Sequence, residues 1–247
     1  MPGLAPSLAA TVPGLVESCQ AAVASLAVGD RVLLLTSGPR LRDDGVSSHP
    51  LTLIHPPGTP VSSAPLTGSN GPTPFASRLS GWSTPDDGAE PCRTDAPGVG
   101  IIVGAALLAA AGIQVPTTAV EVGTEVGTAA PPVEALFTAA ADTDRVVLLV
   151  IAEGSAARGG DLPAGRPDPA QDLDRTLGQA LAAGDPAALA AAVGKALPSA
   201  DSLMFTAGPA FAALARLTMA DHPSRADLLF DCAPLGVGYF VASWLWE

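Results

Sequence analysis

The sequence predicts an α/β fold, a single domain in which helices cover a mostly parallel central sheet in αβα layers. Two short apolar runs, 32–36 and 145–151, are typical of strands that are buried on both faces of a parallel sheet. Segments with helical periodicity alternate with runs of this kind, which favours βαβ connections. Hydrophobic residues make up 48% of the 247 residues and charged residues 15%, which suits one large core. We therefore expect residues 1–247 to form one domain.

The first hundred or so residues are expected to hold a helix, a strand and a long loop region. Apolar side chains recur near a 3.6-residue period over 13–27, which predicts a helix; they are Leu15, Val16, Cys19, Val23 and Leu26. The strand at 32–36 ends at Ser37-Gly-Pro39. Residues 56–98 are a long region rich in Pro, Gly and Ser, which predicts a loop. Around and within it, the composition allows a strand at 51–54 and ordered structure at 75–82.

Regular structure resumes near residue 99 and continues to the end of the chain. Residues 99–103 and 105–111 predict a strand and a helix, or one continuous helix. Further strands are expected at 119–122, 145–151, 228–230 and 237–241, and 145–151 is the strongest candidate for a central strand. Helices are expected at 131–141, 169–183, 185–193 and 208–220. Gly184 is suited to cap the second of these helices, and Asp185 with Pro186 to begin the third.

The composition disfavours several classes of partner. Acidic residues outnumber basic ones 24 to 12, the formal charge is −12, and Lys195 is the sole lysine. Nucleic acid and anionic membranes are therefore disfavoured as partners. Cys19, Cys92 and Cys232 form no CxxC pair, which fits a reducing cytosol. The start lacks the pattern of a signal peptide, and 99–113 is too short to span a bilayer, so a cytoplasmic protein is expected.

Two segments of the chain carry a family resemblance. One is the closing Ala233-Pro-Leu-Gly-Val-Gly-Tyr-Phe-Val-Ala-Ser-Trp244, and the other is the apolar run from Val146 that stops at Ala152-Glu-Gly-Ser-Ala156. Together with Arg31-Val-Leu-Leu-Leu-Thr-Ser-Gly-Pro39, Gly184-Asp-Pro186 and Ala207-Gly-Pro-Ala-Phe211, they resemble the class III extradiol ring-cleavage dioxygenases of the subunit-B-like family. The resemblance is to an alanine-rich branch common in high-GC actinobacteria. It implies an extradiol dioxygenase subunit-B-like fold over most of the chain.

Catalytic members of that family hold Fe(II) with two His and one carboxylate, and a further His acts as acid and base. The resemblance places the first ligand after a strand that would precede Met1–Pro6. It places the second ligand His at Ser37-Gly-Pro39 and the acid–base His at Ala156. Asp201 is nearest in order to the carboxylate ligand. Three expected imidazoles are thus absent from their positions, so we expect no metal cofactor.

The three histidines of the chain offer an alternative metal site. His49 and His55 flank 51–54, and a strand between them would hold them about 20 Å apart unless the chain turns. His222 follows the helix at 208–220. We favour three surface or loop histidines, and the alternative is an Fe(II) site whose displaced ligands are His49, His55 and Glu153.

Candidate pocket residues follow the strand at 145–151, where open α/β sheets place ligands. Glu153, Ser155 and Arg158 are expected to line a polar pocket there, although Glu153 is equally suited to capping the next turn. Neither the GxGxxG nor the GxSxG spacing is present.

These observations predict a diverged, non-catalytic member of the family, a pseudoenzyme that binds a small molecule or a partner protein. The alternative is an active non-haem Fe(II)-dependent ring-cleavage dioxygenase with displaced ligands, and enzyme activity is left open. A subunit that works only with a second chain, or as a homo-oligomer, is also open.

Overall fold

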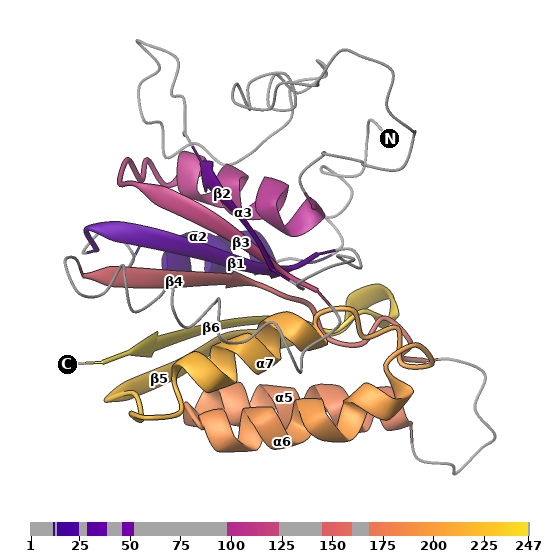
Figure 1. Cartoon of the computed structure of the whole chain (residues 1–247). Helices are drawn as coiled ribbons and strands as arrows, with labels where there is room; N and C mark the ends of the chain where they lie inside the picture. The colour runs from indigo at the N-terminus through magenta and orange to yellow at the C-terminus, as the bar shows by residue number, and fades with distance from the viewer. Residues whose placement is uncertain are drawn as a thin grey trace, which may run out of the picture.

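In the computed structural model, the structure describes residues 12, 14–24, 29–38, 46–51, 98–123, 145–159 and 168–246. The elements in chain order are α2 (Leu15–Ala24), β1 (Arg31–Ser37), β2 (Val46–Leu51), α3 (Val99–Ala110), β3 (Thr117–Val122), β4 (Val146–Ile151), α5 (Pro169–Ala183), α6 (Pro186–Ala196), α7 (Gly208–Leu217), β5 (Arg225–Cys232) and β6 (Tyr239–Leu245). Short 3-10 turns lie at Leu197–Ser199 and Pro234–Gly236. Figure 1 shows helices α5 and α6 on the far side of α7 from the four-stranded sheet. The fold is mixed α/β, as the sequence predicts.

A four-stranded sheet with the order β2-β3-β1-β4 forms one part of the fold. Strands β3 and β4 both pair parallel with β1, whereas β2 pairs antiparallel with β3. Among the described strands the prediction that 145–151 is a central strand does not hold, because β4 is last in their order and β1 is flanked on both sides. The run is apolar because both of its faces pack on hydrophobic clusters, one reached by Leu148 and the other by Leu149.

Alternate residues of β1 face the two helical layers. Val32 and Leu34 pack toward α2 and α3, whereas Leu35 packs toward α7. Helix α3 lies so close to β1 that a Cβ on Gly104 would overlap the buried Leu34 side chain, and one on Gly100 would overlap Thr36. These small residues therefore allow tight helix–sheet packing. No helix in the described ranges is long and apolar enough to cross a membrane.

The C-terminal part packs α5, α6 and α7 around one core and adds the antiparallel hairpin β5–β6. Asp168 caps α5 and Asp185 caps α6 through their side chains, and Pro follows each cap. Gly184 ends α5 in the left-handed conformation, at φ 59°. The Trp244 indole of β6 donates to the Leu181 carbonyl of α5 at 2.7 Å, which ties the hairpin to the helices.

Most sequence predictions for the described elements hold, with shifted boundaries. Residues 99–110 form one helix, and 228–230 and 237–241 fall in β5 and β6. A strand, β2, forms at 46–51, and of the strand expected at 51–54 only Leu51 lies among the described residues. The predictions for 75–82 and 131–141, and most of the loop region 56–98, lie outside the described residues.

Candidate functional site

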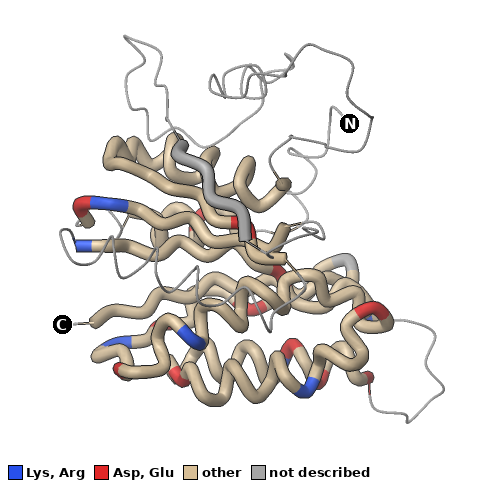
Figure 2. The backbone as a smooth tube through the Cα atoms, viewed as in Figure 1, with Lys and Arg blue, Asp and Glu red and all other residues tan. Residues whose placement is uncertain are grey.

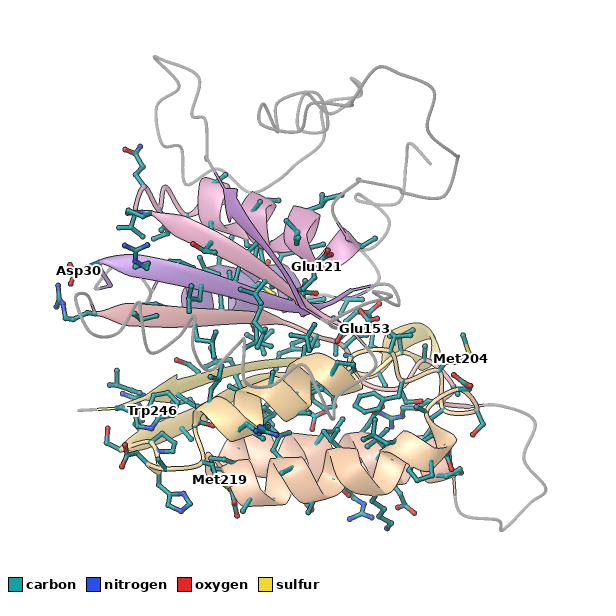
Figure 3. The ribbon with its side chains drawn as sticks, viewed as in Figure 1. Asp30, Glu121, Glu153, Met204, Met219 and Trp246 are labelled. Carbon is teal, nitrogen blue, oxygen red and sulfur yellow. The ribbon has the colours of Figure 1, made fainter. Side chains whose placement is uncertain are left out.

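The carboxyl ends of β1 and β4 meet at one edge of the sheet. Strands β2 and β3, which follow β1 in the chain, lie on one side of β1 in the sheet, whereas β4 lies on its other side. Such a switch in strand order is where open α/β sheets form ligand crevices. Figure 3 shows Glu121 and Glu153 at this edge and Asp30 at the opposite one. The loops that leave this edge are therefore the candidates for a binding site.

The start of α7 is tied to both strand ends. The Ala210 N–H donates to Ser37 Oγ at 3.1 Å, which joins α7 to the last residue of β1. The Thr206 hydroxyl donates to Glu153 Oε1 at 3.0 Å, just beyond β4. Glu153 is exposed, and its carboxylate accepts a side-chain hydroxyl here. The block 207–211, which the family resemblance singled out, thus begins the helix that closes this edge.

The loop after β4 is held by backbone hydrogen bonds to the turn before β6. Gly154 N–H donates to the Gly238 carbonyl and Gly238 N–H donates to the Ser155 carbonyl, both at 2.9 Å. Arg158 N–H donates to the Gly236 carbonyl at 3.1 Å. The loop therefore runs antiparallel to the glycine-rich Gly236-Val-Gly238, which gives the closing sequence motif a structural role.

A buried carboxylate lies beneath this pair of segments. Asp174 of α5 is 2% exposed, and its Oδ1 accepts the Ser155 N–H at 2.8 Å. The Arg158 guanidinium lies 3.5 Å from its Oδ2. Burial raises the pKa of the Asp174 carboxyl, while the Ser155 N–H and Arg158 act to lower it and Asp231 acts to raise it. Glycines at 154 and 238 make room, because a Cβ at either position would overlap this carboxylate.

The three pocket candidates come from one loop but point to different surroundings. Ser155 is fully buried; its hydroxyl donates to the Leu203 carbonyl and accepts the Ala157 N–H at 3.1 Å. Glu153 faces Thr206 at the sheet edge. Arg158 lines an open depression of about 560 Å³, together with Gly159, Asp168, Gln171, Ala233 and Gly236. The structure thus places Arg158 at the depression and Ser155 beneath the loop.

Sequence reasoning missed Asp174, Asp168 and Gln171, although the sequence held a signal for the first of them. Asp174 falls on the apolar stripe of α5, next to Leu173 and three residues before Leu177. A carboxylate in such a stripe indicates a buried polar role.

A second buried carboxylate, Glu121 of β3, also escaped prediction. It is 5% exposed, and its Oε1 accepts the Gly98 N–H at the start of α3 at 3.0 Å. Its pairing partner in β1 is Thr36, which is also buried. Glu121 therefore caps α3 from the neighbouring strand β3. The pattern of polar and apolar residues in β3 alone does not indicate this role. Within the four-stranded sheet, Figure 2 shows the charged residues mainly at the strand ends.

The proposed displaced metal ligands do not come together on the described backbone. His49 of β2 is level with Ala119, and through β1 with Leu149 of β4, whereas Glu153 lies four residues further on. Strand spacing and rise put the His49 and Glu153 backbones on the order of 20 Å apart. His222 is exposed beyond α7, and His55 lies outside the described residues. Among the residues that the structure describes, no group of three His, Cys, Asp or Glu could hold a metal ion.

The positions that the resemblance gives to the imidazoles hold other groups. Ser37 and Gly38 follow β1, and the Gly38 N–H donates to the Val122 carbonyl at 3.0 Å. Ala156 occupies the acid–base position, with its N–H directed to the Met204 carbonyl at 3.4 Å. Asp201, the nearest carboxylate in order, is exposed. No family model matches the chain, and the search of curated proteins also returned no match.

Proposed function

We propose that this chain is a diverged, non-catalytic member of the class III extradiol dioxygenase subunit-B-like family, and that it binds a small molecule beside the loop after β4. The observation that carries the proposal is the state of that loop. Ser155 of this loop is buried and bonded to the Leu203 carbonyl, and the buried Asp174 beneath it accepts the Ser155 N–H. This arrangement supports a loop that shapes a binding surface, since general acid–base chemistry needs a group that can reach the substrate.

The chemistry of ring cleavage supports the same reading. An iron centre of this family needs two imidazoles and a carboxylate on one face of the metal, with open positions for catecholate and O₂. The resemblance places the second ligand His at Ser37 to Pro39 and the acid–base His at Ala156, and none of these residues provides an imidazole. The loop after β4 also borders the depression beside Arg158, and small-molecule sites are concave surfaces with a few convergent polar groups.

The test is metal content and oxygen uptake of the full chain. Protein purified without oxygen is offered Fe(II), Mn(II) and Zn(II) in turn, desalted, and analysed for metal; O₂ consumption is then followed with catechol. We expect less than stoichiometric metal and no catechol-dependent O₂ uptake. One retained equivalent of Fe(II) together with O₂ uptake would overturn the proposal, and loss of both in His49→Ala, His55→Ala and Glu153→Ala variants would establish the displaced-ligand dioxygenase instead.

A further inference from the structure

The depression beside Arg158 lies where three segments meet. The loop after β4 supplies Arg158 and Gly159, and the turn before β6 supplies Ala233 and Gly236. Asp168 and Gln171 come from the start of α5. Its walls are therefore mainly backbone and polar side chains, which favours a ligand that forms hydrogen bonds over an apolar one.

The arginine of this depression is held on one side and open on the other. Its Nη1 lies 3.5 Å from Asp174 Oδ2, and its side chain is one quarter exposed. Within the described part of the chain, no other group pairs with the remaining guanidinium nitrogens. Because the contact with the buried Asp174 restricts the guanidinium at one end, its other donors lose less freedom when they bind a ligand carboxylate.

The aspartate of the depression keeps part of its carboxylate for a ligand. Asp168 Oδ1 accepts the N–H groups of Ala170 and Gln171 at 2.9 and 3.3 Å, as the cap of α5. Its Oδ2 accepts a longer bond, 3.4 Å, from the Gly159 N–H. A carboxylate has about four acceptor positions, so Oδ2 retains a position for a donor in the depression.

Arg158 and Asp168 line the same depression without forming an ion pair with each other. We propose that the depression binds a small zwitterion, an α-amino acid whose carboxylate pairs with Arg158 and whose ammonium pairs with Asp168. This inference rests on the proposed function and names its ligand class. A simple anion would meet the Asp168 carboxylate and a simple cation the Arg158 guanidinium, whereas a ligand with both charges is matched to both.

Two substitutions remove the charges of Arg158 and Asp168 and are expected to leave the fold intact. Arg158→Gln keeps hydrogen-bonding capacity without the positive charge. Asp168→Asn removes the negative charge and leaves a good N-cap, because Asn and Asp cap helices about equally well. The controls carry the same changes outside the depression: Arg175→Gln on the exposed side of α5, where Arg175 pairs with Asp172, and Asp185→Asn at the cap of α6.

The experiment is an NMR titration of the full chain, in which the amide resonances of Gly159 and Gly236 report on the depression. The probes are glycine, L-alanine and L-leucine, each compared with its N-acetyl and carboxamide forms, which lack one charge. We expect saturable shifts with at least one free amino acid, and binding at least about tenfold weaker for its single-charge forms. Arg158→Gln and Asp168→Asn should each weaken binding by about tenfold or more, and the controls by less than about twofold.

Three results would overturn the inference: no saturation with any free amino acid to about 20 mM, single-charge forms that bind as tightly, or unchanged affinity in both depression variants. Its failure is distinguishable from failure of the proposed function. Absence of amino-acid binding in a protein that also lacks iron and O₂ uptake removes only the zwitterion, whereas iron-dependent O₂ uptake removes the non-catalytic assignment.

Discussion

Helices in the two parts of this molecule satisfy their first N–H groups in different ways. In the C-terminal part, α5 and α6 are each capped by the aspartate directly before them, Asp168 and Asp185. In the sheet part, the start of α3 has no side-chain cap of its own, and the Gly98 N–H is bound by Glu121 from β3, 23 residues away in sequence. Helices α5 and α6 thus use local chemistry, whereas α3 uses a contact that exists only after the sheet has formed. Helix α7 resembles α3 in this respect, because its Ala210 N–H is bound by Ser37 of β1.

The two cores differ in the same sense. The helical core is assembled from many small side chains on successive helices, with Leu177 and Leu189 fully buried among alanines. The sheet core depends on β1, whose Leu34 and Leu35 contact opposite faces through residues distant in sequence. We infer that stability is spread over near neighbours in the helical part and concentrated in a few residues of β1 in the sheet part.

The largest expected effect tests that contrast. Leu34→Ala removes a fully buried side chain of β1 and should lower the free energy of unfolding by about 3–5 kcal/mol. Leu189→Ala in α6 should cost less, about 2–3 kcal/mol, because its alanine neighbours on two helices can close on the cavity. Urea unfolding followed by circular dichroism measures both, with the exposed Leu229→Ala as control. Equal losses for the two buried positions would contradict the contrast.

The same substitution in two helices should have opposite signs. Gly104→Ala in α3 should destabilise by about 1–3 kcal/mol, because the new Cβ would overlap Leu34 and lie 3.2 Å from Ile151. Gly194→Ala in α6 meets nothing within 4 Å and should stabilise by about 0.5–1 kcal/mol, the gain in helix propensity. Midpoints of thermal unfolding would show the two shifts. A stable Gly104→Ala protein would mean that α3 can move away from β1.

The local character of the C-terminal caps gives a smaller, sharper test. Asp185→Ala removes the acceptor for the Ala188 N–H and should cost about 1 kcal/mol, whereas Asp185→Asn should cost a few tenths. Chemical denaturation of the two variants measures the difference. If Ala and Asn are equivalent at this position, the capping bond contributes nothing and the comparison between the two parts of the molecule loses its basis.

How much the sequence could predict follows from this difference. The range 169–183 matches α5 because Pro169 and Gly184, together with the leucine stripe, are all local signals. The position of β4 among the described strands was predicted wrongly. An apolar run indicates that both faces of a strand are covered, not that both of its edges are paired. In the site, Arg158 was found from its place after a strand, whereas Asp168 entered the site only through the packing of α5 against the loop. Hydrophobic periodicity does not indicate which distant segments pack together. The role of a residue such as Glu121 can therefore be recognised only once the strands and helices are arranged in space.

The smallest expected effect concerns Asp174, where the two parts of the molecule meet. Burial raises the pKa of this carboxyl in the folded protein, so between the unfolded and folded pKa values the folded state binds more protons. Its contribution to stability is therefore present at low pH and is lost as pH rises through the folded pKa. Asp174→Asn cannot titrate, so the stability of this variant relative to the wild type should increase as pH rises from about 3 to 7.

Urea denaturation of both proteins at several pH values measures that difference, and Asp172→Asn on the exposed side of α5 is the control. The groups that face Asp174 are Arg158 and the Ser155 N–H from the loop, and Asp231 from β5. The first two favour the ionised form and partly offset burial, which is why the effect is the smallest of the series. A relative stability that falls with pH would mean that these partners outweigh burial, and that the loop after β4 is held by an ionised Asp174.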